Sequence, residues 1–250
     1  MRVISLVPSL TETLLDSGVD VVGRTRFCIH PERLVQSIPV VGGTKEVNWD
    51  TCADLHPDLI VMDREENTLQ MADSCPFPWH ATHIVSIESV GDELGSLAER
   101  MESSELKTLS EKWNQLAVTP EARFSGWSQL PGFKQLIGSG EGAFTKIEYV
   151  IWKNPWMAVS RDTFIGSVLI KVGLGEFLPD HDKPYPKLDD DAIPASDTFY
   201  LFSTEPYPFE RYVGELESLG FHGALMDGEL YSWFGSRSYR LLNQYLASNE

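Results

Sequence analysis

The side chains that could do chemistry are gathered in a few short segments, and the loop at residues 24–31 is the richest of them. Phe27 could stack on a flat ligand, and Arg24 could pair with a carboxylate or a phosphate. Cys28 and His30 are residue types that ligate metals, but the spacing places no third ligand beside them. We therefore expect Cys28 to be a small buried apolar residue and predict no metal site.

Other candidate ligand contacts directly follow short apolar runs. Pro8 and Ser9 follow the run at residues 3–7, and Gly43 and Thr44 follow the run at residues 39–42. In open α/β sheets the carboxyl ends of the strands face the ligand crevice, and a glycine there lets the backbone approach a ligand closely. We expect these four residues at a ligand site. The alternatives are an ordinary helix cap at Ser9 and an ordinary turn at Gly43.

Two tryptophans, Trp152 and Trp156, flank Pro155 just past an apolar run in the second half of the chain. Such side chains could form an aromatic wall, which binds flat macrocycles through burial and stacking. Core packing is the alternative for both. We predict that Trp156 contacts the ligand and that Trp152 packs in the core.

The composition excludes several classes of function. The 250 residues carry a formal net charge of −17, which repels nucleic acid, and no segment approaches the roughly 18 consecutive apolar residues of a membrane span. Three cysteines without a CxxC pair form neither a disulfide framework nor a structural zinc site. No GxSxG, HExxH or paired-carboxylate motif supports an enzyme, so a hydrolase that uses Ser9 or a metal at Cys28 and His30 is the weakest alternative.

The elements that must position these residues alternate between strand and helix, as in a parallel α/β sheet. In the first lobe, residues 1–88, we expect strands at 3–7, 19–22, 39–43, 57–62 and 83–87. In the second lobe, residues 120–250, we expect strands at 147–152, 198–203 and 224–227, and helices at 162–172, 208–219 and 236–247.

Residues 89–119 have a helical pattern of their own. Val90, Leu94, Leu97 and Met101 follow a spacing of three and four, which resumes at Leu106 after a slip of five. We interpret the segment as one linking helix of about 28 residues, roughly 40 Å long, which as a stiff strut would allow only small lobe movements. The alternative is two helices that meet at residues 103–104.

Several motifs, in this order and spacing, resemble a known family. The resemblance covers nearly the whole chain and is carried by residues 3–14, 21–25, 40–43, 55–61, 151–157, 161–165, 205–209 and 227–229. The chain resembles the helical-backbone substrate-binding proteins of ABC importers for vitamin B12, siderophores and haem, and is most similar to the corrinoid-binding branch.

The resemblance implies two Rossmann-like lobes with parallel sheets, joined by one long rigid helix, with a ligand cleft between the lobes. It implies no catalysis and no covalent cofactor, and a ligand that is cobalamin, haem or a ferric siderophore. In this family the loop before the last helix contacts the ligand, which points to Trp233 and Arg237 here. One acidic residue on each lobe docks on the permease, and we expect Glu66 and Glu205 in that role.

The remaining expectations concern partners and compartment. We expect a monomer that binds a small molecule and an ABC permease, and no nucleic acid. The fold begins directly after Met1. This predicts a periplasmic protein if a leader has been removed and a cytoplasmic protein as the chain is written. The second case goes with an alternative function, a cytoplasmic cofactor carrier or sensor of the same fold without a transport role.

Overall fold

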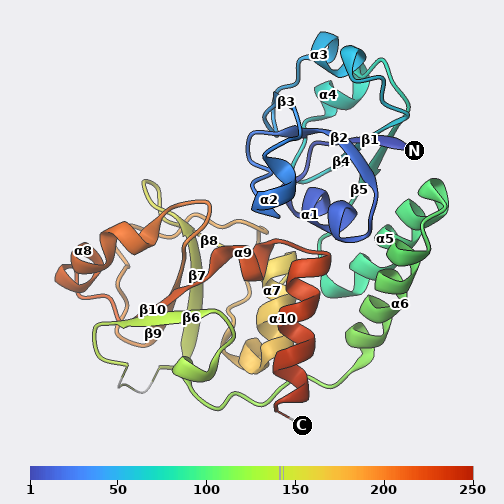
Figure 1. The fold of residues 1–250 in the computed structure, drawn as a ribbon. Helices are drawn as coiled ribbons and strands as arrows, with labels where there is room; N and C mark the ends of the chain where they lie inside the picture. Colours follow the sequence, from blue (N-terminus) through green and yellow to red (C-terminus); the bar gives the residue numbers. More distant parts are fainter. Residues whose placement is uncertain (141, 143, 250) are drawn as a thin grey trace. The chain divides into compact units, whose positions relative to one another are not determined.

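The structure is a computed structural model that describes residues 1–140, 142 and 144–249. It separates into two compact units (Figure 1). The first unit contains Met1–Thr119 and Trp233–Arg240, and the second contains Pro120–Ser232 and Leu241–Glu250. In the described part of the chain, no helix has the length and apolar character needed to cross a membrane.

The first unit is built on a five-stranded parallel sheet with the strand order β3-β2-β1-β4-β5. The order reverses between β1 and β4, so the loops that leave these two strands diverge. Doubly wound sheets bind their ligands at this kind of switch point, outside the carboxyl ends of the strands. The strands are β1 (Arg2–Ser5), β2 (Asp20–Thr25), β3 (Val40–Gly42), β4 (Leu59–Asp63) and β5 (Trp79–Thr82).

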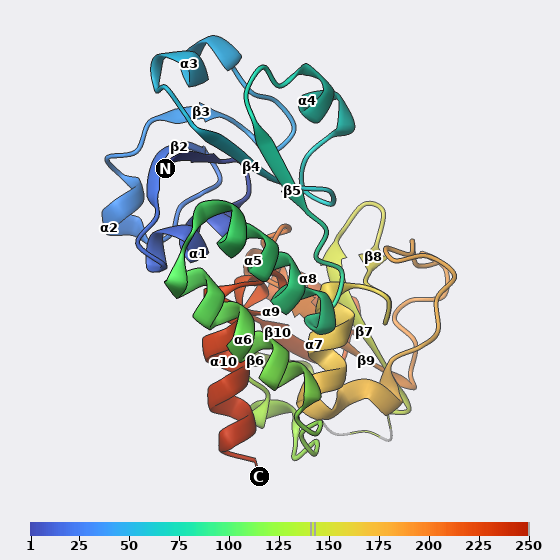
Figure 2. The ribbon, with the colours of Figure 1, turned by 90° about the vertical axis from the view of Figure 1, so that its right-hand side faces the viewer.

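The sheet of the first unit is covered on both faces, which explains the nearly continuous apolar runs of its central strands. All five residues of β4 are buried, as are Val3, Ile4 and Ser5 of β1. Helices α3 (Trp49–Asp54) and α4 (Leu69–Ser74) lie on one side of the sheet, and α1 (Pro8–Asp16) lies on the other (Figures 1 and 2). A short helix, α2 (Glu32–Val35), follows β2.

The fifth strand of this sheet lies earlier than predicted. We expected a strand at 83–87, but β5 is Trp79–Thr82 and Ile87 begins helix α5 (Ile87–Met101). Ser86 and Ser89 form a capping box at the start of α5. The apolar residues Ile84 and Ile87 are buried at this helix entry, so their spacing was wrongly interpreted as a strand.

The single long linking helix is also wrong. The segment forms two helices, α5 and α6 (Ser104–Val118). Glu102 between them adopts a left-handed conformation, and Ser103 caps α6 by accepting a hydrogen bond from Leu106 N. The Ser110 hydroxyl donates to the Gly91 carbonyl at 2.7 Å, so the helices are packed against each other as a hairpin. The slip of five in the apolar spacing was the signal of this turn, and the argument for a stiff strut no longer holds.

The second unit has a mixed five-stranded sheet with the order β6-β10-β9-β7-β8. Its three central strands are parallel, as predicted, but the two edge strands are antiparallel to their neighbours. We did not predict β6, because three of its five side chains are exposed and its apolar pattern is weak. The strands are β6 (Phe133–Ile137), β7 (Lys146–Trp152), β8 (Met157–Ala158), β9 (Thr198–Ser203) and β10 (Gly223–Met226).

The helices of the second unit are shorter than expected. The predicted helix at 162–172 is α7 (Phe164–Leu169) followed by a wider turn at Ile170–Leu174, where Gly173 has a φ of 94°. The predicted helix at 208–219 begins as a 3₁₀ turn, Phe209–Tyr212, and continues as α8 (Val213–Ser218). The last two helices are α9 (Gly228–Ser232) and α10 (Ser236–Ala247), and α10 has the predicted bounds.

The hairpin of α5 and α6 predicts a specific coupling between residues 91 and 114. A Cβ atom at Gly91 would lie 1.9 Å from the Oδ1 atom of the exposed Asn114 side chain, so Gly91→Ala alone must displace this amide and is expected to gain less than the about 1 kcal/mol that alanine's helix propensity contributes. In the Asn114→Ala background the new methyl group meets no amide, so Gly91→Ala is expected to stabilise α5 fully through alanine's higher helix propensity.

Thermal unfolding of the four proteins of this double-mutant cycle measures the coupling. In one continuous helix the two residues would be about 35 Å apart and their effects would add. Additive effects would therefore contradict the hairpin.

Candidate functional site

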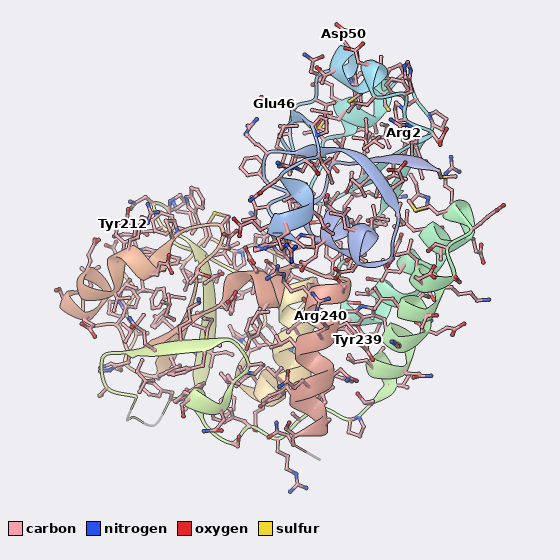
Figure 3. The ribbon with its side chains drawn as sticks, viewed as in Figure 1. Arg2, Glu46, Asp50, Tyr212, Tyr239 and Arg240 are labelled. Carbon is pink, nitrogen blue, oxygen red and sulfur yellow. The ribbon has the colours of Figure 1, made fainter. Side chains whose placement is uncertain are left out.

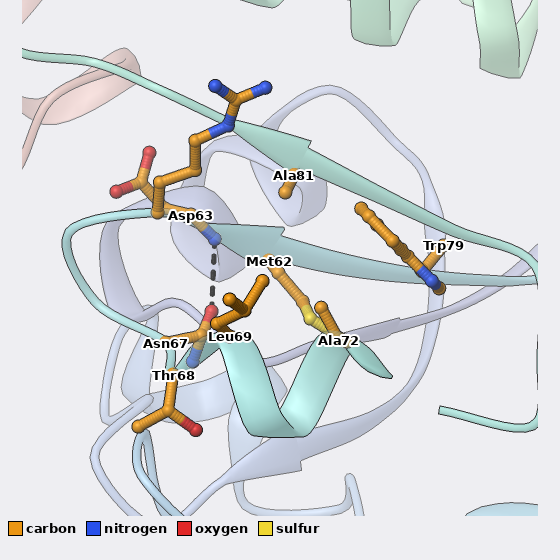
Figure 4. Close-up of a pocket in the computed structure, with 9 residues that line it drawn as sticks. Met62, Asp63, Asn67, Thr68, Leu69, Ala72, Trp79 and Ala81 are labelled. Carbon is orange, nitrogen blue, oxygen red and sulfur yellow. Dashed lines mark hydrogen bonds between the residues drawn. The ribbon is translucent and has the colours of Figure 1, made fainter. Parts of the chain in front are cut away.

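The carboxyl edge of the first sheet is organised by two buried polar residues at the end of β4. The Asn67 amide nitrogen donates to the carbonyls of Leu6 at 3.2 Å and Thr44 at 2.8 Å, and its amide oxygen accepts from Asp63 N at 3.0 Å (Figure 4). The Asp63 carboxylate accepts from the Thr82 hydroxyl at 2.6 Å. These bonds join the chain segments that follow β1, β3, β4 and β5 into one edge.

The predicted contacts at the ends of β1 and β3 differ in their accessibility. Pro8 is half-buried at the start of α1, and Thr44 is half-buried with its carbonyl engaged by Asn67. Ser9 is buried, and its carbonyl accepts a bond from the Thr13 hydroxyl at 2.8 Å. Ser9 is therefore packed within α1, and the helix cap that was the alternative for Ser9 lies at Val7 instead.

Arg24 is used to hold its own loop together. Its guanidinium donates to the carbonyl of Val35 at 2.8 Å and to those of Thr25 and Cys28 at 3.1 and 3.2 Å. These bonds use the Nε and Nη1 atoms, and the contact of Arg24 with a ligand anion stays a prediction. Short loops without regular hydrogen bonding need such donors for their carbonyls, and the sequence alone did not reveal this.

Phe27 is exposed, as a ligand contact must be, with 49% of its surface accessible. The Arg26 guanidinium lies over its ring at 4.9 Å and also forms a 2.7 Å ion pair with Glu46, which Figure 3 labels. A Cβ atom at Gly43 would lie 3.0 Å from this guanidinium, so Gly43 makes room for Arg26. We did not single out Arg26, although its position next to Phe27 was a usable signal.

Cys28 and His30 are held by different neighbours. The Cys28 thiol is fully buried between the Thr11 and Thr25 hydroxyls at 3.0 and 3.1 Å, and burial raises its pKa. His30 packs edge-on against Trp233 with ring centroids 5.4 Å apart. Within residues 1–140, 142 and 144–249, no group of three or more His, Cys, Asp or Glu side chains is arranged to hold a metal ion.

Trp233 and Arg237 belong to the first unit, where they pack against α1. The Arg237 guanidinium forms a bidentate pair with Glu12 at 2.7 and 3.1 Å and lies 5.1 Å from the centre of the Trp233 ring. Arg240, labelled on α10 in Figure 3, pairs with Glu12 at 3.2 Å and with Asp16 at 2.7 Å. Trp233 is 8% exposed, so both predicted contacts are occupied by the protein's own side chains.

This packing depends on a glycine. Gly235 has a φ of 95°, a left-handed conformation that side chains disfavour, and a Cβ atom there would lie 2.1 Å from the Thr13 hydroxyl. The same hydroxyl accepts a hydrogen bond from Ser236 N at 3.0 Å, and the Gly235 carbonyl accepts one from the Trp113 indole at 3.0 Å. The turn before α10 is therefore fixed to both α1 and α6.

The two tryptophans of the second unit are placed opposite to our prediction. Trp156 is 9% exposed and stacks on Phe209 in the core, with ring planes 5° apart. Trp152, the last residue of β7, is 40% exposed and packs edge-on against Tyr207 at 5.4 Å. The reversal arises because β8 returns alongside β7 and carries Trp156 inward. Trp152 and Tyr207 form the exposed aromatic pair at the carboxyl edge of this sheet.

Tyr207 is a neutral phenol in this arrangement. A hydrogen bond with Tyr212 is the main cause that raises the pKa of Tyr207 to about 12, with desolvation and the nearby charge of Glu215 adding to it. Its ring also lies 4.7 Å from that of Phe209, so the exposed aromatic pair is continuous with the core. Tyr207 lies in an irregular loop after β9, so no periodic pattern in the sequence marks it.

The two predicted docking residues each follow a strand of their own unit. Glu205 is exposed in the loop after β9. Glu66 is half-buried, and desolvation raises the pKa of its carboxyl, with Asp63 and Glu65 adding to the shift and Lys45 opposing it. The neighbouring Glu65 is exposed and lies 3.5 Å from His83, so it is the more accessible carboxylate of this loop.

Solved structures with the same fold cover nearly the whole chain. The vitamin B12 binding protein BtuF of Vibrio cholerae has a TM-score of 0.68 at 14% identity, over 98% of this chain and 95% of its own. A periplasmic heme binding protein from Pseudomonas aeruginosa has a TM-score of 0.70 at 16% identity, over 99% and 92%. An ABC transporter substrate-binding protein from Listeria monocytogenes EGD-e has a TM-score of 0.67 at 12% identity, over 98% and 96%.

The chain has the fold of these binding proteins. The α/β class with one sheet in each unit is therefore confirmed. No known protein family profile matches the sequence, and neither does any curated protein. At 12–16% identity the similarity establishes the fold, and individual site residues must be argued from this chain's own geometry.

The ion pairs of Glu12 predict unequal effects of two arginine substitutions. Arg237→Ala leaves the buried Glu12 carboxylate without its bidentate partner and is expected to cost about 2–3 kcal/mol of stability. Arg240 is 58% exposed, so Arg240→Ala is expected to cost about 1 kcal/mol or less. Thermal and urea unfolding of both variants measure the difference. Equal costs would contradict the assignment of Arg237 as the main partner of Glu12.

Proposed function

We propose that this protein is a substrate-binding protein of an ABC importer, and that its ligand is a large, flat metal chelate of the corrinoid or haem class. The observation that carries the proposal is the fold similarity over the full chain to proteins named for vitamin B12 and heme binding. A binding role needs a shaped surface with few polar contacts and no catalytic group.

The geometry of each unit supports a flat, largely apolar ligand. The first unit presents Phe27, backed by Arg26, in the loop after β2. The second unit presents Trp152, backed by Tyr207, at the end of β7. Ligands of α/β sheets bind at the carboxyl ends of strands, and both aromatic side chains lie there. Large ring faces gain most from aromatic contacts, because these combine burial with stacking.

Polar contacts to the ligand would come from the segments next to these aromatic side chains. In the first unit Pro8 and Thr44 border the edge organised by Asn67, and Arg26 supplies a cation. In this proposal Trp233 and Arg237 do not contact the ligand. They stabilise the turn before α10, and their packing leaves little accessible surface for a ligand.

Delivery to a permease requires docking residues on both units, and we place the protein in the periplasm. Glu205 is the candidate on the second unit. On the first unit the β4–α4 loop offers Glu65 and Glu66, and exposure favours Glu65 as the carboxylate that meets a basic permease surface. A carrier or sensor without a permease would need neither carboxylate.

The proposal predicts saturable one-to-one binding of cyanocobalamin or haemin with a Kd of about 1 µM or tighter. Absorption spectra and isothermal titration calorimetry measure it, with a ferric siderophore titrated in parallel. If all three ligands fail to bind to the folded protein, the proposed ligand class is wrong.

The aromatic side chains provide a matched pair of variants for this titration. Trp152→Ala removes an exposed ring at the carboxyl edge of the second sheet and is expected to weaken binding about tenfold. Trp79→Ala removes a similarly exposed ring, which lies at the opposite, amino-terminal end of β5, and is expected to leave the affinity unchanged. Equal affinities for both variants and the original protein would exclude Trp152 from the site.

A further inference from the structure

A pocket lies entirely within the first unit, between strands β4 and β5 and helix α4, and shares Asp63 and Asn67 with the carboxyl edge of the sheet (Figure 4). Its volume is about 380 Å³, within the usual range for small-molecule sites. Space of this size equals about a dozen water molecules and suits a bicyclic aromatic molecule. Two of the residues that line it, Ala72 on α4 and Ala81 on β5, have small side chains, which leaves room in the pocket.

The wall of the pocket is apolar and partly open to solvent. Met62 and Ala72 form its inner surface, and Trp79 and Leu69 stand at its sides (Figure 4). Trp79 is 43% exposed and Leu69 is 77% exposed, which is unusual for two large apolar side chains that border the same cavity. An occupant with a flat apolar body would cover both.

Arg64 is the one cationic side chain among the residues that line the pocket, and the buried carboxylate of Asp63 lines it as well. Arg64 lines the pocket, its backbone N–H donates to the Thr82 carbonyl at 2.9 Å, and its guanidinium pairs with no side chain or carbonyl of the described residues. The carboxylate of the adjacent Glu65 does not pair with Arg64; its Oε1 atom lies 3.5 Å from the Nε2 atom of His83. A guanidinium of this kind can form a bidentate bond with a carboxylate.

We propose that this pocket binds a small aromatic carboxylate, with its ring against Trp79 and Leu69 and its carboxylate on Arg64. The site is additional to the proposed chelate-binding function and does not depend on it. Charges more than about 8 Å away are largely screened at physiological salt, so most of the net charge of −17 does not oppose this binding. The one carboxylate that lines the pocket, Asp63, accepts hydrogen bonds from Glu65 N, the Thr82 hydroxyl and Ile84 N, while the Arg64 contact is direct.

Calorimetric titration with 1-naphthoate tests the proposal. We expect one-to-one binding to the original protein with a Kd of about 0.1–1 mM, as suits a ligand of this size. The neutral analogue 1-naphthalenemethanol is expected to bind about tenfold more weakly, because it cannot pair with Arg64.

Two variants and one control assign this binding to the pocket. Arg64→Gln should weaken naphthoate binding about tenfold and leave the neutral analogue unchanged. Ala72→Leu should fill the pocket and abolish the binding of both probes. Arg33→Gln, which removes an exposed arginine on α2, should change neither affinity.

Three results would overturn the proposal. The first is that naphthoate shows no saturable binding up to about 10 mM. The second is that the original protein and Arg64→Gln bind naphthoate with equal affinity. The third is that naphthoate competes with cyanocobalamin or haemin. The last result would place naphthoate in the chelate site. Because the first two readouts do not involve the chelate, failure of the chelate-binding function leaves this test intact.

Discussion

The first unit depends on the buried side chain of Asn67. A parallel sheet fixes its strands by ladder hydrogen bonds, but the loops that leave the carboxyl ends have no ladder of their own. One amide group with two donors and an acceptor meets this need by holding Leu6, Thr44 and Asp63 together. Because unpaired buried polar groups are costly, the position of each loop is tied to the others. The candidate contacts at Pro8 and Thr44 owe their arrangement to this residue.

A second constraint acts at the start of α10. Its first turn is fixed to α1 by the Glu12–Arg237 pair and by Gly235, whose backbone passes too close to Thr13 for any side chain. Further along the same helix, Tyr245 contacts the Val172 carbonyl within the second unit. One helix thus contributes to both units, and the residues that the resemblance assigned to ligand contact instead stabilise its beginning. These contacts explain why Trp233 is buried although it lies in a connecting loop, a kind of segment that usually runs over the surface.

Much of the fold was predictable because buried parallel strands have a strong apolar signal, as at β4 and β9. The break between α5 and α6 was only the alternative to one long helix, because its turn contains neither glycine nor proline and only the slip of five after Met101 marked it. The site was harder to predict. Trp156 is buried and Trp152 is exposed because β8 pairs with β7, and this tertiary pairing cannot be inferred from the local sequence. The role of Asn67 likewise arises from residues 23 and 61 positions away.

The role of Asn67 is tested most directly by hydrogen exchange of backbone amides in Asn67→Ala. The account predicts at least tenfold faster exchange in residues 43–47 and 63–68, because about three hydrogen bonds are lost there, with unchanged protection in the second unit. Asn48→Ala, which removes only a helix cap on α3, is the control and should affect that helix alone. Unchanged exchange in both loops, or a uniform increase throughout the protein, would contradict the claim that Asn67 holds this edge of the sheet together.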